Sequence, residues 1–188
     1  MGHGERGQEV VEGRGSEVMY RPDDLRVGDV LAMTRSNPLW TPAGGLDVGI
    51  EVSTVCPFTH CAVIVEKDGQ LVMVEALWHV TISPVDKYTD TGWILRPRLT
   101  ADQQARFSAA PLSKVGQRYG LRAVAQDFLR DDVHIDLHPH IDPQHMDCSE
   151  LAVWSLRQVD YRVTYAPAPS PADVGYSATL DGARPWPV

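Results

Sequence analysis

The sequence predicts a single α+β domain in which a mostly antiparallel sheet packs against helices. Runs of alternating, β-rich residues fill the first half of the chain, one clear hairpin lies among them, and amphipathic helical patterns follow in the second half. The chain has 188 residues, of which 43% are hydrophobic. It is therefore long enough to bury a sizeable core without help from metals or disulfides.

The elements are expected in the following order. Strands are predicted at 26–34, 58–66, 70–78, 79–88 and 92–98, with a Pro- and Gly-rich loop at 35–47. Asp68-Gly69 is a turn pair that joins the second and third strands as a hairpin. Thr100 and Gln103 form a capping-box pattern that opens a helix near 101–110, and Pro111 is expected to end or kink it. The remaining predictions are helices at 121–130 and 148–159, a strand at 161–165 and a helix start at Ser170-Pro171.

The composition excludes several classes of protein. No apolar run approaches the roughly 20 residues of a membrane span. Seventeen Lys and Arg against 25 Asp and Glu give a formal net charge of −8, which argues against nucleic acid as the main partner. Three cysteines are too few, and odd in number, for a disulfide scaffold. The sequence carries no signal for the oligomeric state.

The first 19 residues are rich in glycine and charge, and have neither strand nor helix periodicity. We expect residues 1–19 to be a flexible leader and residues 20–188 to form the domain. The leader lacks the basic start and apolar middle of a secretion signal, so a cytoplasmic location is expected.

The hairpin brings a base and a carboxylate together. A two-residue turn at 68–69 pairs residue 62 with 75 and residue 60 with 77, which places His60 and Glu75 on one face as diagonal neighbours about 7–8 Å apart at Cα. A carboxylate within reach of an imidazole holds its orientation and favours its charged form. The pair therefore matches two members of a catalytic triad. Cys61 points to the opposite face by the same alternation, and is expected to lie outside the site.

Cys148 is the best candidate for the missing nucleophile. It lies at the predicted start of an amphipathic helix, where unpaired amides and the positive end of the helix dipole lower a thiol's pKa. The amides that follow are placed to bind an oxyanion. Asp147 would oppose this activation, so its side chain is expected to cap the helix or turn outward.

Three segments resemble a known family. DCSELAVW (147–154) resembles the nucleophile helix of NlpC-type papain-like peptidases, and its Cys-Ser-Glu-Leu form is similar to the circularly permuted branch. VGDVLA (27–32) and THCAVIVE (59–66) resemble the strands that precede the cysteine in permuted amidases. The resemblance implies a papain-like fold with circular permutation, and a cysteine hydrolase that uses Cys148 as nucleophile, His60 as base and Glu75 as third member.

The resemblance also suggests substrate contacts. KVGQRYG (114–120) is similar to the family's Gly-x-x-Tyr segment, which implies that Tyr119 is a pocket residue, and SPADV (170–174) resembles the segment that closes the pocket. Ser149 follows the nucleophile, and Trp40 in the long loop is a candidate for an apolar groove, whereas core packing is favoured for Trp78. Cys61 departs from the family pattern, which has a small residue after the histidine.

A His- and Asp-rich loop at 134–145 matches no family segment. It could rim the cleft, with His145 as a substrate contact, or it could hold a metal through His134, His138 and His140. Its spacing fits no named zinc pattern, so no cofactor is expected.

The predicted function is hydrolysis of an amide, peptide or acyl bond through an acyl-enzyme. The alternatives are a lipid acyltransferase or acyl hydrolase with the same triad, and a non-catalytic module that binds a metal or ligand.

Overall fold

A computed structural model describes residues 22–34, 58–88, 92–118, 146–163, 169–180 and 184–186. The predicted leader, the long loop at 35–47 and the helix at 121–130 lie outside these residues. The described part confirms an α+β architecture.

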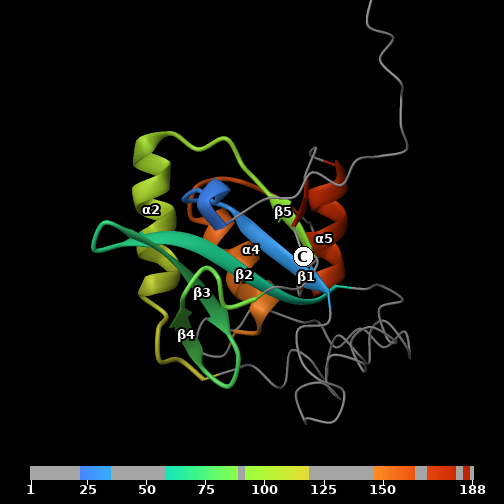
Figure 1. Ribbon diagram of the computed structural model, residues 1–188, viewed down its shortest axis with the longest axis horizontal. Helices are drawn as coiled ribbons and strands as arrows, with labels where there is room; N and C mark the ends of the chain where they lie inside the picture. The colour runs from blue at the N-terminus through green and yellow to red at the C-terminus, as the bar shows by residue number, and fades with distance from the viewer. Residues whose placement is uncertain are drawn as a thin grey trace, which may run out of the picture.

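The strands form one antiparallel sheet in the spatial order β4-β3-β2-β1-β5-β6 (Figure 1). They are β1 (Val30–Thr34), β2 (Phe58–Lys67), β3 (Gln70–Ala76), β4 (Val80–Ser83), β5 (Gly92–Leu95) and β6 (Arg184–Trp186). The sequence predicts the first five of these strands but not β6, a three-residue strand that contains Pro185. The central strands β1 and β2 are buried over most of their length, because hydrophobic residues pack against both of their faces.

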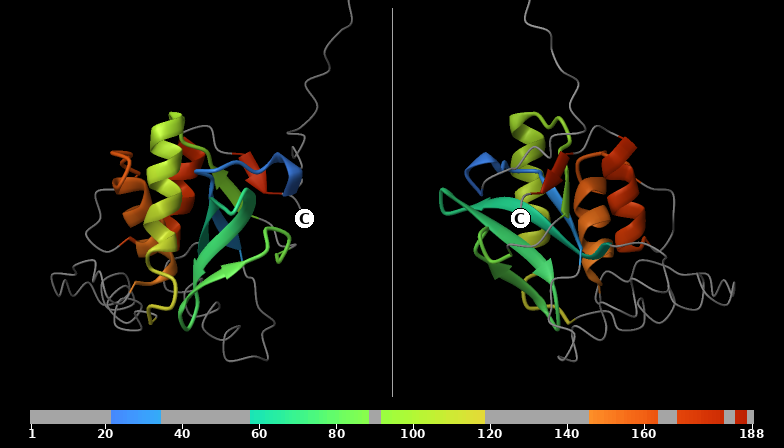
Figure 2. Two further views of the ribbon diagram at one scale, coloured as in Figure 1. Left: turned by 90° about the vertical axis from the view of Figure 1, so that its left-hand side faces the viewer. Right: turned by 45° about the vertical axis from the view of Figure 1, so that its right-hand side comes forward.

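The helices α2 (Ala101–Leu112), α4 (Cys148–Arg157) and α5 (Pro171–Leu180) lie together on one side of the sheet (Figure 2). A short 3₁₀ helix, η1 (Pro22–Asp24), precedes β1. The larger core cluster joins this helical layer to alternate residues of the strands, including Cys61, Val63 and Val65 of β2. A smaller cluster on the other face of the sheet includes Ala62 and Ile64 of the same strand.

The β2–β3 hairpin has the register that its turn pair predicts. Lys67 pairs with Gln70, and Ala62 pairs with Glu75. Asp68 and Gly69 have φ values of 53° and 76°, the left-handed conformation that a tight two-residue hairpin turn requires at both positions. The register fixes which side chains of the two strands share a face.

Gly28 and Asp29 fix the entry into β1. Gly28 has a φ of 100°, and a Cβ atom there would lie 2.7 Å from Leu99 Cδ1, so glycine is required by both backbone and space. Asp29 is 1% exposed and accepts two hydrogen bonds of 2.7 Å from the Arg96 guanidinium. These contacts join the start of β1 to the segment after β5.

One helix prediction agrees with the structure and one strand prediction needs correction. Pro111 is the penultimate residue of α2, which ends at Leu112, close to the predicted end. The capping box of Thr100 and Gln103 is confirmed. Residues 161–163 are not a strand. Instead, the amide of Tyr161 donates to the Leu156 carbonyl, and Asp160 has a φ of 61°, so this segment caps the end of α4.

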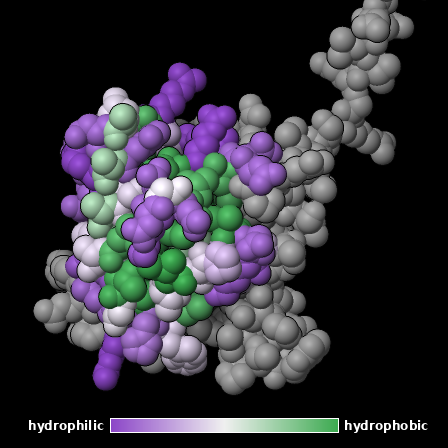
Figure 3. Space-filling view, turned by 60° about the vertical axis from the view of Figure 1, so that its left-hand side comes forward, coloured by the Kyte–Doolittle hydropathy of each residue, from purple (hydrophilic) through white to green (hydrophobic). Residues whose placement is uncertain are grey.

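The face that the helices leave uncovered carries hydrophobic residues near its middle with hydrophilic residues around them (Figure 3). The prediction that Trp78 packs in the core is wrong, because this residue is 67% exposed. Trp78 follows the end of β3, where the alternation of buried and exposed residues no longer applies. None of the described helices combines the length and apolarity needed to cross a bilayer.

Candidate active site

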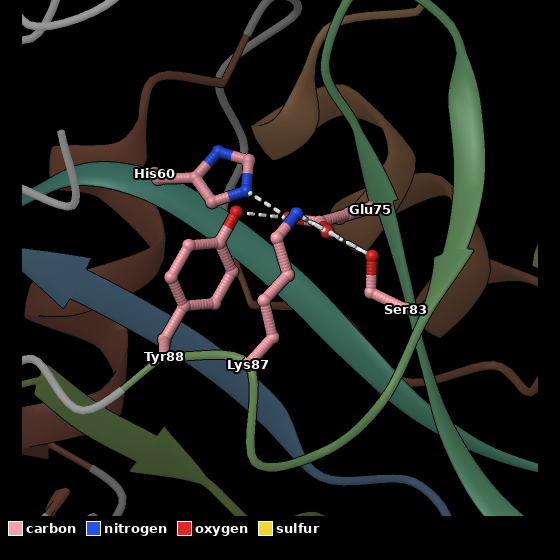
Figure 4. Close-up of polar contacts among 5 residues, drawn as sticks. All are labelled: His60, Glu75, Ser83, Lys87 and Tyr88. Atoms are coloured by element: carbon pink, nitrogen blue, oxygen red, sulfur yellow. Dashed lines mark hydrogen bonds and ion pairs between the residues drawn. The ribbon is translucent and has the colours of Figure 1, made fainter.

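His60 and Glu75 meet as the hairpin register predicts. Glu75 lies opposite Ala62, so its side chain shares the face of the diagonal residue His60. The Nε2 atom of His60 lies 2.9 Å from Oε2 of Glu75, and both residues are buried. Because Nε2 is used by Glu75, Nδ1 is the nitrogen left for a second partner, and it points away from the carboxylate (Figure 4).

Three further side chains hold the Glu75 carboxylate, and none of them is predicted from the sequence. Ser83 Oγ and Lys87 Nζ donate to Oε1 at 2.5 and 2.6 Å, and Tyr88 OH donates to Oε2 at 2.5 Å (Figure 4). The Tyr88 ring also packs edge-on against the His60 imidazole, with 5.9 Å between ring centroids. The carboxylate is therefore fixed at both oxygens, and its orientation toward the imidazole is fixed with it.

These donors explain the charge state of Glu75. Burial alone would raise its pKa, but the hydrogen bond and charge of His60, together with the bonds from Lys87 and Ser83, lower the pKa to about 2. Glu75 is thus an anion across the physiological range. Lys87 Nζ and Glu75 Oε1 form an ion pair at 2.6 Å. The lysine side chain is 33% exposed.

Cys148 is the first residue of α4, as predicted, and is 3% exposed. Asp147 caps the helix: its Oδ1 accepts from the Glu150 amide at 2.7 Å, and its own amide donates to the Glu150 carboxylate at 3.1 Å. The expectation that Asp147 caps the helix is confirmed. The amides of Cys148 and Ser149 are the first two of the helix, and have no carbonyl partner within it.

The pKa values of His60 and Cys148 shift in opposite directions. Burial alone would lower the pKa of His60, but the negative charge of the Cys148 thiolate, a hydrogen bond to that sulfur and the bond to Glu75 raise it to about 10. A hydrogen bond from the Cys61 side chain, with the charge and hydrogen bond of His60, lowers the pKa of Cys148 well below its usual range against the effect of burial. Both shifts favour a thiolate–imidazolium pair.

Cys61 lies on the face of β2 opposite to that of Glu75, as strand alternation predicts. The alternation itself holds, because Cys61 packs in the core cluster of the helical face while Ala62, the pairing partner of Glu75, packs in the cluster of the other face. The helix α4 covers the face of Cys61, and Cys148 belongs to the same core cluster. The register between β1 and β2 also shifts next to His60. Met33 pairs with His60 and Thr34 pairs with Phe58, so the pairing skips Thr59.

Ser149 does not lie where a substrate contact would be expected. Its side chain is fully buried, and its hydroxyl donates to Asp147 Oδ1 at 2.8 Å and to the Pro169 carbonyl at 2.7 Å. This placement speaks against a substrate contact by the side chain. It gives the serine a structural role instead, because it ties the start of α4 to the segment before α5.

Several candidate residues lie outside the described part of the chain. They are the expected substrate contacts Trp40, Tyr119 and His145, and the weak metal candidates His134, His138 and His140. Within the residues that the structure describes, no group of three or more His, Cys, Asp or Glu side chains is arranged to hold a metal ion. The two oxygens of Glu75 are already occupied by Ser83, Lys87, Tyr88 and His60, which does not suit a metal ligand.

Ser83 could have been found from the sequence by extending the hairpin logic to the next strand. Glu75 pairs with Thr81 of β4, so Ser83 shares its face as a diagonal neighbour. Lys87 and Tyr88 lie in the segment after β4, and no periodicity predicts where such side chains point.

Comparison with known proteins finds a likeness to solved structures, and it concerns the fold. No protein-family model matches the chain, and no curated protein matches it either. Among solved structures, the crystal structure of the metalloprotein yiiX from Escherichia coli O157:H7 is similar, with a TM-score of 0.55 and 14% identity over 73% of this chain and 68% of that chain. At this identity the likeness shows the shared fold alone.

Proposed function

We propose that the protein is a thiol hydrolase that cleaves an amide, peptide or acyl bond through Cys148, His60 and Glu75. The observation that carries the proposal is the buried His60–Glu75 pair at 2.9 Å, and the raised pKa of His60 and the lowered pKa of Cys148 support it. A thiolate at a helix start, a buried imidazole and an anchored carboxylate are the groups that acyl transfer needs.

In the first half of the reaction, the Cys148 thiolate attacks the carbonyl carbon of the substrate and a tetrahedral oxyanion forms. The amides at the start of α4 are placed to donate to that oxyanion. The His60 imidazolium gives its proton to the leaving nitrogen or oxygen, the bond to that atom breaks, and a thioester on Cys148 remains.

In the second half, the neutral imidazole removes a proton from water, and the resulting hydroxide attacks the thioester. The carbon–sulfur bond then breaks, which releases the acid and restores the thiolate with the imidazolium. Glu75 keeps the ring oriented throughout, because Ser83, Lys87 and Tyr88 hold its carboxylate in place. If another nucleophile replaces water, the same steps give acyl transfer, which covers the lipid acyltransferase alternative.

The order of the elements supports a circularly permuted papain-like arrangement. The strand that carries His60 precedes the helix that begins at Cys148, and the resemblance of DCSELAVW (147–154) to the permuted branch agrees with this order. We therefore propose membership of that branch of the NlpC-type hydrolases.

Trapping of the acyl-enzyme tests the proposed function. The purified protein is mixed with p-nitrophenyl esters of short and long acyl chains and with amino-acid p-nitroanilides, and is then quenched in acid for intact and peptide mass spectrometry. The proposal predicts an acyl adduct on Cys148 and release of p-nitrophenol, both lost in Cys148→Ala. Acylation of other residues only, or release that persists in Cys148→Ala, would overturn it. The preferred acyl length separates lipid-like from peptide-like substrates.

A second candidate function is a metal-binding module without turnover, favoured by the name of the similar metalloprotein. Metal analysis of the purified protein separates it from the hydrolase. Stoichiometric zinc that is lost in a His138→Ala/His140→Ala double variant, together with an inert Cys148, would favour the module. A metal-free protein that acylates at Cys148 would exclude it.

A further inference from the structure

Thr59, the residue before His60, carries a buried hydroxyl that the fold does not use. Its Oγ1 atom has no hydrogen-bond partner among the residues that the structure describes, and the whole residue is 2% exposed. The side-chain oxygen of Gln117 is the other unpaired buried atom in the described part of the chain, but Gln117 itself is half-buried. A buried hydroxyl without a partner costs free energy, so such a group in a native protein points to a role outside the fold.

A bulge in β2 sets the position of Thr59. Met33 and Thr34 of β1 pair with His60 and Phe58, so Thr59 is the extra residue of β2 and has no partner in β1. Without the bulge, Phe58 would share the face of His60, because side chains of a strand alternate. Phe58 packs instead in the core cluster of the helical face. Bulges are common beside active sites, where the extra residue redirects a side chain.

The three consecutive residues from Phe58 to His60 join the two halves of the candidate site. Phe58 packs in the core cluster that contains Cys148, whereas His60 bonds to Glu75. Thr59 lies between them, and consecutive Cα atoms are only about 3.8 Å apart. The helix that begins at Cys148 packs directly against β2. The unpaired hydroxyl therefore belongs to the short stretch of β2 where a substrate must meet Cys148 and His60.

The chemistry of the substrate indicates what this hydroxyl would bind. Amides, peptides and esters differ in their substituents, but each brings a carbonyl oxygen next to the carbon that Cys148 attacks. A hydroxyl can donate to that oxygen, and the bond strengthens as the oxygen gains negative charge. Thr59 is 2% exposed, against 3% for Cys148 and 6% for His60, so it is hidden to the same degree as the groups that must react.

We propose that Thr59 is a substrate-contacting residue whose hydroxyl donates a hydrogen bond to the carbonyl oxygen of the acyl substrate, together with the amides at the start of α4. This inference rests on the proposed thiol hydrolase function, and it adds a side-chain donor to the backbone donors of the oxyanion. The contact needs no proton transfer, because the hydroxyl keeps its proton while the oxyanion forms and collapses.

Two reactions of the Cys148 sulfur separate this role from a role in holding the site together. Attack on p-nitrophenyl acetate forms an oxyanion, whereas alkylation by iodoacetamide takes place at a saturated carbon and forms none. Thr59→Val keeps the shape of the side chain without the hydroxyl, so acylation of Cys148 should fall by about 10²-fold while its alkylation rate stays within about twofold of the wild type. Thr59→Ser keeps the hydroxyl and should retain most of the acylation rate.

The melting temperature of the full-length protein gives the structural readout. Because the Thr59 hydroxyl has no partner in the described fold, Thr59→Val should melt at or above the temperature of the wild type. Thr100→Val is the matched control, since the same change there removes a hydroxyl that accepts a hydrogen bond from the Gln103 amide at the start of α2. It should lower the melting temperature and leave the acylation rate unchanged.

The inference is wrong if Thr59→Val is acylated as fast as the wild type, or if its alkylation rate falls together with its acylation rate. A melting temperature well below that of the wild type, or a failure to fold, would also contradict it, because the hydroxyl would then have a structural partner. Failure of the proposed function looks different: the wild type itself forms no acyl adduct on Cys148, and the inference is then wrong as well.

Discussion

The Nε2 atom of His60 lies 2.9 Å from Oε2 of Glu75, and neither residue has more than a few per cent of its surface exposed. Burying a charged carboxylate is costly unless it is paired with an opposite charge and hydrogen-bonded. Here Ser83, Lys87 and Tyr88 supply the remaining donors to the carboxylate. The pair therefore stays ionised, and its geometry follows from the register of a single hairpin.

Removal of the Glu75 charge should slow the chemistry more than it alters substrate binding. We expect Glu75→Gln to reduce the rate of acylation at Cys148 by about 10²- to 10⁴-fold, because the neutral amide orients the imidazole poorly and does not stabilise the imidazolium. Stopped-flow release of p-nitrophenol measures this rate. Glu66→Gln is the matched control, because Glu66 lies on the same hairpin but is exposed. An equal loss in both variants would contradict the role given to Glu75.

The Glu75 carboxylate should also set the acid stability of the fold. Its pKa is lowered from 4.5 to about 2 in the folded protein, so the ionised group contributes about 3 kcal/mol at neutral pH. A depressed pKa gives stability that is complete above the unfolded pKa, and that is lost as the pH falls from about 4.5 through about 2. Urea unfolding over this pH range should show a steep decline for the wild type and a shallower one for Glu75→Gln. Parallel curves would refute the assignment.

Lys87 should influence the pH profile through Glu75. Its hydrogen bond helps to lower the pKa of Glu75, so Lys87→Met should raise that pKa and move the acidic limb of activity to higher pH. The pH profile of acylation rate measures the shift. Lys67→Met is the matched control, because Lys67 pairs with the exposed Asp68 at the hairpin end. A profile that moves equally in both variants, or not at all in Lys87→Met, would contradict this role.

Gly28 should be less replaceable than Gly69, although both have positive φ. A Cβ at Gly28 would lie 2.7 Å from Leu99 Cδ1, whereas at Gly69 nothing lies within 4 Å. Urea unfolding should therefore show a loss of about 1 kcal/mol for Gly69→Ala from backbone strain alone, and about 2–3 kcal/mol for Gly28→Ala. Leu99→Ala in the Gly28→Ala background should recover part of the steric cost. Equal losses for the two glycine variants would show that the Leu99 contact is unimportant.

The parts of the site that the sequence predicts are those governed by local rules. The Asp68-Gly69 turn fixes the hairpin register, and the register brings His60 to Glu75. The Asp147 and Glu150 capping box fixes the first turn of α4, which puts Cys148 at the helix start. Each of these features depends on residues close in sequence or on strand alternation.

The parts that the sequence does not predict depend on packing between distant elements. Strand alternation gives the face of Cys61 correctly, but only the docking of α4 on that face puts Cys61 and Cys148 in one core cluster. Lys87 and Tyr88 reach Glu75 from an irregular segment, where no periodicity assigns a direction to side chains. Trp78 is exposed for a related reason, because it lies in the bend after β3 has ended.

The central claim is that His60 keeps Cys148 as a thiolate, and the pH dependence of alkylation tests it most directly. The protein is treated with limiting iodoacetamide over a range of pH, and the rates at Cys56, Cys61 and Cys148 are compared by mass spectrometry. Ordinary thiols, with a pKa of about 8.5, are almost fully protonated at mildly acidic pH and react slowly there.

We predict that Cys148 is alkylated fastest of the three thiols at mildly acidic pH. His60→Ala should shift the pH curve of Cys148 alkylation toward that of an ordinary thiol. His79→Ala is the control, because His79 is exposed, and it should leave the curve in place. If Cys148 reacts no faster than Cys56 or Cys61, or if its pH curve is the same with and without His60, the proposed thiolate–imidazolium pair does not exist.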